Sequence, residues 1–175
     1  MGFDLVTFSG GKGLRGPQSA GLLFGREDLI QAAKLQHVPH SDTIGRGMKV
    51  NKEEVLAMYV ALKRYVNIDH EEQWSRWKSE IQLISDTVEK VPGVQTEYYV
   101  PEIANHVPSL RITWDRERVD IAPSEAQTRL REGHPSIEVA GGSDDLSLTT
   151  WMMRPEEVEF VGRRIREVLE QTAPQ

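Results

Sequence analysis

The first 35 residues place two short apolar runs around a glycine-rich segment. Residues 3–8 are rich in β-branched and aromatic side chains, which predicts a strand. Residues 20–24 are wholly apolar, which predicts a second strand buried on both faces, as in a central sheet. Between them, residues 9–17 contain four glycines and a proline and predict a loop. Residues 26–35 predict a short helix.

Two longer helices follow. Apolar side chains at helical spacing predict one that begins after Asn51, a residue suited to capping the first turn. This helix is apolar nearly all round, so we expect other parts of the protein to cover it from several directions. A second helix is predicted over 69–90, ending near Pro92 and Gly93. Its apolar stripe, typical of lengthwise packing on another element, is Trp74, Trp77, Ile81, Ile84, Val88 and Val91.

The remaining residues alternate in the order β-β-α-β-β-α. Apolar alternation and turn residues predict strands over 95–100, 109–115, 135–140 and 145–151. Helices are predicted over 124–132 and 155–170, and residues 141–144 are expected to form a hairpin turn. The pattern indicates a small α+β module, a sheet with helices on one face.

Composition narrows the classes of function. The chain has 175 residues, a formal net charge of −6 and no cysteine. The acidic balance argues against a nucleic-acid partner, and the missing cysteines exclude disulfides and thiolate chemistry. The longest apolar run, Val55 to Leu62, is too short to span a bilayer, so no membrane partner is expected. No signal-peptide pattern opens the sequence, and we therefore expect a cytoplasmic protein.

The loop Ser9-Gly10-Gly11-Lys12-Gly13 carries the clearest chemical signal. Glycines leave a lysine at the end of a strand unobstructed and let backbone N–H groups face an anion. The alternative is an ordinary surface turn with a solvated lysine. A nucleotide phosphate loop is excluded because Gly13, not Ser or Thr, follows the lysine.

Other charged residues give weaker signals. Arg15, Arg26, Arg46 and Lys49 surround glycine-rich segments and could form an anion-binding mouth, although scattered surface charges would give the same pattern. The five histidines show no metal-ligand spacing, so no metal site is expected.

Two segments resemble a known family. The runs DLVTFSGGKGLRGPQSAGLLFGREDLIQAA and IGRGMKVNKEEVLAMYVALKRY are similar to pyridoxal-phosphate enzymes related to bacterial selenocysteine synthase. Within that family they look most like the D-glucosaminate-6-phosphate ammonia-lyase-like branch. The similarity is strong over residues 1–66 and covers the rest of the chain only as a general small-domain pattern.

The resemblance implies a fold and a site. The implied fold is α/β, the C-terminal half of the aspartate-aminotransferase-like (fold type I) transferase fold. It assigns residues 1–68 to a large cofactor-binding domain with a mostly parallel sheet, 69–92 to a connecting helix and 93–175 to a small α+β domain. Lys12 would form the Schiff base with pyridoxal 5'-phosphate. The implied cofactor-binding set is Ser9, Gly10, Gly11, Lys12, Arg15 and Gln18.

The resemblance also implies a reaction. The enzyme would act on a small-molecule amino acid or amino sugar acid by elimination with release of ammonia, and it would work as a homo-oligomer. Because the family's site needs residues that this chain lacks, we expect the chain to be inactive alone. Three alternatives stay open: a non-catalytic remnant or oligomerisation module, a selenocysteine synthase-type transferase, and an anion-binding protein without covalent catalysis.

Overall fold

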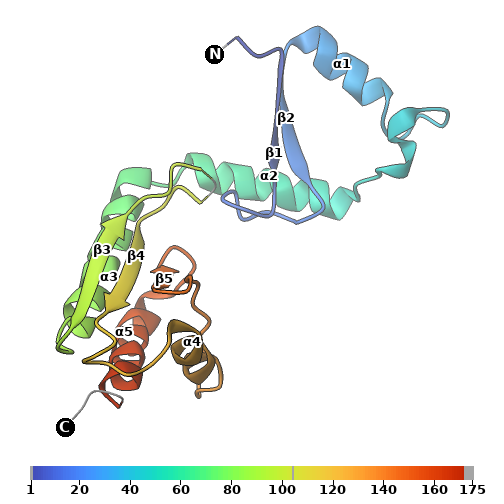
Figure 1. Ribbon diagram of the computed structural model, residues 1–175. Coiled ribbons are helices and arrows are strands. Elements are labelled where there is room, and N and C mark those ends of the chain that lie inside the picture. The colour runs from blue at the N-terminus through green and yellow to red at the C-terminus, as the bar shows by residue number, and fades with distance from the viewer. Residues whose placement is uncertain (1, 104, 172–175) are drawn as a thin grey trace. The chain divides into compact units, whose positions relative to one another are not determined.

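The computed structural model describes residues 2–103 and 105–171. The chain divides into two compact units, Met1–Ile68 and Asp69–Gln175 (Figure 1). Each unit has its own sheet and helices, and each is considered by itself below. All four tryptophans belong to the second unit; they are Trp74, Trp77, Trp114 and Trp151.

The first unit is a hairpin followed by helices. Strands β1 (Leu5–Ser9) and β2 (Gly21–Gly25) pair antiparallel, with Leu5 opposite Gly25 and Ser9 opposite Gly21. The helices that follow are α1 (Glu27–Leu35), the short 3-10 helix η1 (Ile44–Gly47) and α2 (Lys52–Val66). The sequence therefore located the two strands and both longer helices of this unit to within a residue or two.

Helix α2 begins where its capping residue predicts. The Asn51 N–H donates a hydrogen bond of 3.0 Å to Glu54 Oε2, which closes the first turn. Only Met58 and Ala61 of this helix are buried. The described residues therefore pack against one face of α2 and leave the rest open, and cover of that open part from beyond this chain stays a prediction.

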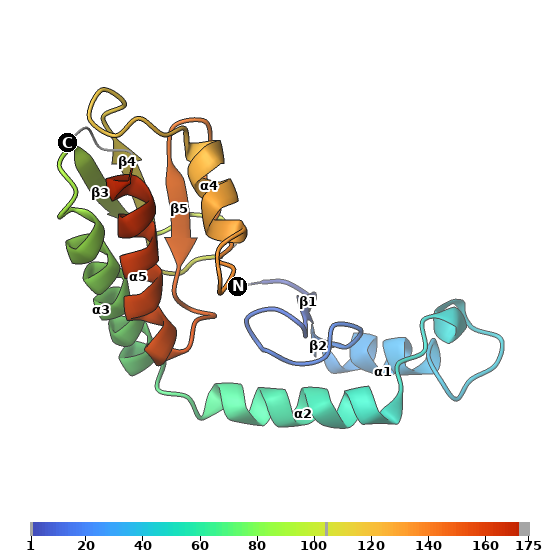
Figure 2. The same ribbon diagram turned by 90° about the horizontal axis from the view of Figure 1, so that it is seen from below.

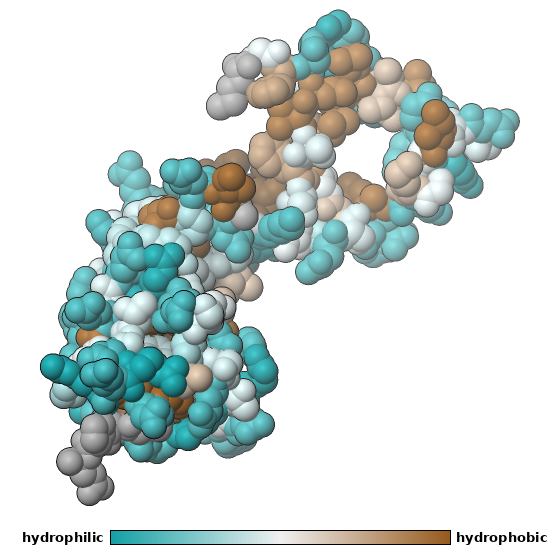
Figure 3. All heavy atoms as spheres, viewed as in Figure 1, coloured by the Kyte–Doolittle hydropathy of each residue, from teal (hydrophilic) through white to brown (hydrophobic). Residues whose placement is uncertain are grey.

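The prediction that β2 is buried on both faces is also wrong. Four of its five residues are exposed, and Phe24 exposes 46% of its surface. The parallel pairing implied by the resemblance is not seen here either, since both sheets of the described residues are antiparallel. Figure 3 shows hydrophobic atoms, in brown, gathered over the hairpin of the first unit. The sequence correctly indicated two apolar strands, but the described elements of the chain leave most of their residues exposed.

The second unit is a two-layer arrangement of sheet and helices. Its sheet has the antiparallel order β3-β4-β5, built from Val94–Tyr99, Ser109–Trp114 and Leu146–Thr149. Helices α3 (His70–Val88) and α5 (Pro155–Glu170) lie side by side over one face, and α4 (Pro123–Arg131) lies beside α5 (Figure 2). Helices thus cover one face of the sheet, as the alternation predicted.

The core of this unit lies between that layer of helices and the sheet. The predicted stripe of α3 is confirmed at its centre, where Ile81, Ile84 and Val88 are buried, while Trp74 is only partly covered. Helix α5 lies against α3 at Gly162, where a Cβ would make van der Waals contact with the Ile84 Cα at 3.4 Å. The Asp69 carboxylate caps α3 by accepting hydrogen bonds from two backbone N–H groups of its first turn.

The strand predicted over 135–140 does not form. Only Ala140 of that segment pairs, in an isolated bridge with Ser147. Ile137 and Val139 are nevertheless buried, so the apolar alternation reports burial correctly. Pro135 has no N–H for a sheet ladder, and the Ile137 N–H donates instead to Leu130 O of α4 at 3.0 Å. The segment packs on the core as extended chain without joining the sheet.

Candidate functional site

The glycine loop after β1 is closed by its own backbone. The Gly10 N–H donates to Ala20 O at 2.9 Å, and the Gly16 N–H donates to Gly10 O at 2.7 Å. A tighter turn sits inside, where the Arg15 N–H donates to Lys12 O at 2.8 Å. Lys12 therefore stands at the start of a defined turn, with its side chain exposed.

Two glycines allow this loop to lie against α2. A Cβ at Gly10 would come within 2.5 Å of Ala20 O and 2.6 Å of Met58 Sδ. A Cβ at Gly16 would lie 2.8 Å from the same sulfur and 3.2 Å from the Ala61 Cβ. Gly10, Met58 and Ala61 are thus buried together, and this contact fixes the base of the loop on the helix.

A polar contact holds the far end of the loop. The Ser19 hydroxyl donates to the Glu54 carboxylate, which also accepts the Asn51 N–H. The bond from Ser19, and then that from Asn51, lower the pKa of Glu54 below its ordinary value. The ionised carboxylate therefore links the loop to the start of α2.

A cavity of about 520 Å³ lies beside this loop, between the hairpin and the end of α2. Ser9, Lys12 and Gly13 form its polar side. Its other lining residues are apolar or aromatic: Phe8, Leu14, Leu22, Phe24, Leu62, Tyr65 and Val66. The lining therefore includes the amine-bearing Lys12 and the hydroxyl-bearing Ser9 and Tyr65 in a wall that is mostly apolar.

The structure separates the predicted site residues into two groups. Ser9 and Lys12 line the cavity together, whereas Arg15 and Gln18 are not among its lining residues. Gln18 instead packs against Gly11, whose Cβ would lie 2.9 Å from the Gln18 Cα. Arg15 has a φ of 55°, an unusual value for a residue other than glycine. Gly10 and Gly11 act through backbone placement.

Arg26 does not belong to an anion-binding mouth. Its guanidinium pairs with Asp4 at 3.0 Å and with Asp28 at 2.7 Å. These hydrogen bonds, from Asp28 first and then Asp4, raise the pKa of Arg26. Its charge is therefore already balanced, and the prediction that groups it with Arg15 is wrong for this residue.

Metal-binding clusters and membrane-spanning helices are both absent from residues 2–103 and 105–171. Within those ranges, no three His, Asp or Glu side chains gather in the way a metal ion requires. None of the helices described there is long and apolar enough to cross a membrane.

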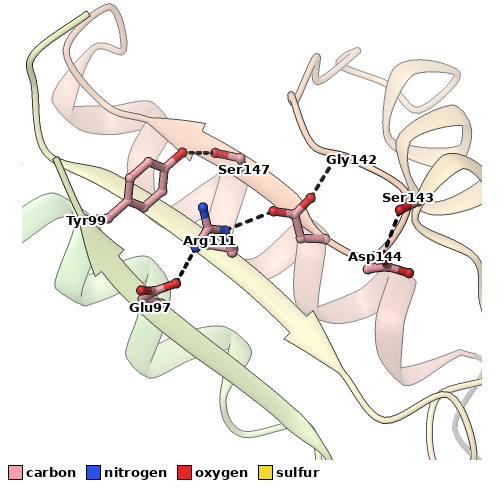
Figure 4. A network of polar contacts seen from close by, with 8 residues as sticks. Glu97, Tyr99, Arg111, Gly142, Ser143, Asp144 and Ser147 are labelled. Atoms are coloured by element: carbon pink, nitrogen blue, oxygen red, sulfur yellow. Dashed lines mark hydrogen bonds and ion pairs between the residues drawn. The ribbon is translucent and has the colours of Figure 1, made fainter. Parts of the chain in front are cut away.

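A second polar cluster lies on the sheet face of Asp69–Gln175 that faces away from the helices (Figure 4). Arg111 pairs with Glu97 and, through Nε, with Asp145 Oδ2 at 3.1 Å. Its guanidinium carbon also lies 4.7 Å from the centroid of the Tyr99 ring, and the Tyr99 hydroxyl is 2.6 Å from Ser147 Oγ. Two carboxylates thus pair with one guanidinium, and the polar groups of the cluster bond to one another.

Some residues of the site could not have been found by motif. The cavity wall comes from Leu62, Tyr65 and Val66 as well as from the hairpin, and Ser19 meets Glu54 across 35 residues of sequence. The sequence did offer one signal for the part contributed by α2, the helical spacing of the apolar residues at 55, 58, 62 and 66. That spacing indicated a packed face, but it did not identify the element against which the face packs.

Comparison with known proteins gives a consistent assignment. The sequence model of the family described as L-seryl-tRNA selenium transferase matches residues 1–109. The chain is 27% identical over 171 residues to a 5'-C-glycyluridine monooxygenase-decarboxylase of a Streptomyces species. It is 24% identical over 177 residues to the D-glucosaminate-6-phosphate ammonia lyase of Salmonella typhimurium.

The solved structure of a D-glucosaminate-6-phosphate ammonia-lyase has a similar fold, with a TM-score of 0.74 at 23% identity. The alignment covers 98% of this chain and 45% of that chain. The two curated relatives are covered similarly: 96% and 98% of this chain correspond to 42% and 45% of theirs. The chain therefore spans less than half the length of the proteins it matches.

Proposed function

Because this chain belongs to the L-seryl-tRNA selenium transferase family, we propose that its first unit carries the lysine-bearing part of a pyridoxal-phosphate-dependent lyase or transferase site. The observation that supports this most directly is the position of Lys12, in a closed glycine loop at the end of β1 and on the wall of a cavity. Lys12 is the proposed covalent attachment point.

The described residues fit part of what this cofactor requires. Lys12 supplies an exposed amine, Ser9 supplies a hydroxyl beside it, and the apolar wall can accept a flat ring. No carboxylate lines the cavity in the part of the chain that the structure describes. We therefore propose that the remaining contacts to the phosphate and the ring nitrogen come from polypeptide outside these 175 residues.

In a completed site, Lys12 would have two roles. Bound pyridoxal phosphate supplies an electron sink that stabilises a carbanion beside the substrate's amino group. Lys12 holds the cofactor, and its Nζ, once released, is the base placed to accept a proton from the substrate's α-carbon. Ser9 hydrogen-bonds an anionic oxygen at the edge of the cavity, and the apolar wall excludes water from the reacting carbon.

The proposed substrate is a small amino acid or amino sugar acid, and the proposed reaction is elimination with release of ammonia. The net charge of −6 disfavours a tRNA-bound substrate. Self-association and a site shared between copies, with the Arg15 to Gln18 segment serving a neighbouring subunit, belong to the same proposal.

The test is to map where the cofactor attaches. A complete version of the enzyme, which contains this chain and the part of its relatives that it does not span, is incubated with pyridoxal phosphate, reduced with borohydride and digested, and the pyridoxyl group is located by mass spectrometry. We expect it on Lys12 and expect Lys12→Ala to lose at least about 90% of the label. Lys52→Ala, which removes an almost fully exposed lysine of the same unit, should keep it.

A label spread evenly over the lysines, or concentrated on another one, would contradict the proposed role of Lys12. That result would favour the alternative of a non-catalytic assembly module. The large exposed apolar surface of the first unit supports that second candidate.

A further inference from the structure

Strand β3 forms one edge of the sheet in the second unit. It stands at the end of the order β3-β4-β5 and pairs with β4 on its inner side. The backbone groups of successive residues in such a strand point alternately toward the neighbouring strand and away from the sheet. An edge with free outward groups can pair with a strand of another chain, so natural sheets usually block it.

Two outward N–H groups of β3 are already bonded within the chain. The Val94 N–H donates to Val91 O at 3.1 Å, and the Thr96 N–H donates to Glu89 Oε1 at 3.1 Å. These donors are two residues apart, so they lie on the same side of the strand, and neither acceptor belongs to β4. That side is therefore the edge, and Tyr98, the next residue in the alternation, directs its N–H to the same side.

The contact from Glu89 is made by a side chain, so a single substitution can remove it. Glu89 is the C-cap residue of α3, and its Oε1 also accepts the Thr96 hydroxyl at 2.7 Å. The Thr96 hydroxyl uses its only proton in that bond, so the Ser85 hydroxyl, 2.7 Å away, donates to Thr96. The end of α3 thus holds the middle of the edge strand through three hydrogen bonds.

The opposite edge of the sheet is covered in a different way. Ala140 and Ser147 of β5 exchange two backbone hydrogen bonds, from the Ala140 N–H at 2.9 Å and from the Ser147 N–H at 2.7 Å. Backbone therefore covers the edge at β5, whereas a carboxylate covers the middle of the edge at β3. A side-chain substitution can uncover a backbone donor at β3 but not at this bridge.

We propose that the Glu89 carboxylate blocks the edge of β3 by occupying the Thr96 N–H that an added strand would need. Without this carboxylate, Thr96 and Tyr98 would present free donors to the same edge of a second copy, and two β3 strands would pair antiparallel about a twofold axis. The negative charges of two Glu89 side chains would also repel each other in such a pair. The block concerns the second unit and is independent of the role proposed for Lys12.

Amide hydrogen exchange of the 175-residue chain tests the bond. At low protein concentration, Glu89→Ala should raise the exchange rate of the Thr96 amide about tenfold or more. Glu89→Gln keeps an oxygen acceptor, so its rate should stay within about threefold of the wild type. Glu159→Ala is the matched control, because Glu159 is an exposed glutamate of α5 that makes no hydrogen bond or ion pair with the described residues.

Association tests the blocking role. In sedimentation velocity, the Glu89→Ala chain should associate at least about tenfold more strongly than the wild type, whereas Glu89→Gln and Glu159→Ala should match the wild type. Exchange at Thr96 and Tyr98 should slow as the concentration of the Glu89→Ala chain rises, because pairing protects the outward amides. Adding Thr96→Pro removes the outward N–H at an edge position, where proline is tolerated, and should restore wild-type association.

Several results would overturn the proposal. An unchanged Thr96 exchange rate in Glu89→Ala would overturn the bond, and equal association of Glu89→Ala and the wild type would overturn the blocking role. Stronger association without slower exchange at Thr96 and Tyr98 would assign the association to another surface. If Glu89→Gln associated as strongly as Glu89→Ala, the hydrogen bond would not be the block. The exchange measurements use chains without Thr96→Pro, so they decide the matter even if that variant does not fold.

Discussion

Both units contain many apolar residues, but they differ in how many of these residues they bury. In Asp69–Gln175, apolar side chains from three helices and three strands meet in one core, where residues such as Ile84, Ile112 and Ile165 are fully buried. In Met1–Ile68, Met58 and Ala61 are the buried apolar side chains among the described residues, and strands and helix alike expose theirs. The second unit has an extensive packed core of its own, whereas the first unit buries few apolar side chains within itself.

This difference predicts where a core substitution has its largest effect. Ile84→Ala removes a fully buried side chain between α3 and α5 and should lower the free energy of unfolding of the second unit by about 2–5 kcal/mol. Urea unfolding followed by far-ultraviolet circular dichroism measures it.

The neighbouring residue provides the control. Leu83 is 41% exposed on the same helix, and Leu83→Ala should change the free energy of unfolding by less than about 1 kcal/mol. Equal effects of the two substitutions would show that the second unit lacks the packed core described here.

The first unit should be sensitive at its glycine loop. Gly10→Ala places a methyl group 2.5 Å from Ala20 O, so the loop must move away from α2 at a cost of about 1–3 kcal/mol. Amide hydrogen exchange at Gly16, whose N–H is bonded to Gly10 O, should accelerate. Pyridoxyl labelling of Lys12 should fall with it.

Gly13→Ala is the matched control for the loop. A Cβ at Gly13 meets nothing within 4 Å, so exchange at Gly16 should be unchanged. If both glycine substitutions act alike, the contact with Met58 does not hold the loop in place.

The smallest expected effect is the response of the loop to acid. The pKa of Glu54 is lowered in the folded protein, so its bond to Ser19 stabilises the unit above the ordinary carboxyl range and is lost as pH falls through the lowered value. The NMR shift of the Asn51 amide, which donates to Glu54, should titrate with a midpoint below 4.5.

Glu54→Gln should abolish this titration. A midpoint at or above 4.5 in the wild type would contradict the link between Ser19 and Glu54, and would remove one of the two contacts that attach the loop to α2.

Sequence patterns predicted the positions of helices and strands better than they predicted burial and strand pairing. Ile81, Ile84 and Val88 predicted both the helix α3 and its buried face, because the partner of that face lies in the same chain. The apolar run at β2 predicted a strand correctly and its burial wrongly, since the described elements leave four of its five residues exposed. At 135–140 the alternation predicted burial correctly and pairing wrongly, because the Ile137 N–H is bonded to Leu130 O and Pro135 has no N–H to donate.

In the candidate site, too, the local structure could be predicted from the sequence and the longer-range contacts could not. The loop from Ser9 to Gly13 could be identified from glycine and lysine spacing alone, since its turn is closed by local backbone bonds. The packing of Gly10 on Met58 and the bond from Ser19 to Glu54 could not, because they join residues 35 or more positions apart. The roles toward a cofactor stay predictions for all the residues of the implied set: Ser9, Gly10, Gly11, Lys12, Arg15 and Gln18.

The distribution of tryptophans has a practical consequence for observing this protein. Because all four lie in Asp69–Gln175, light that excites indole selectively produces emission from that unit alone, and Met1–Ile68 is silent. A pyridoxyl chromophore on Lys12 would then be an energy acceptor in the first unit, and the indole donors would all belong to the second unit. Energy transfer to this acceptor would quench the indole emission, and the extent of quenching would report the distance between the two units in solution without any added dye.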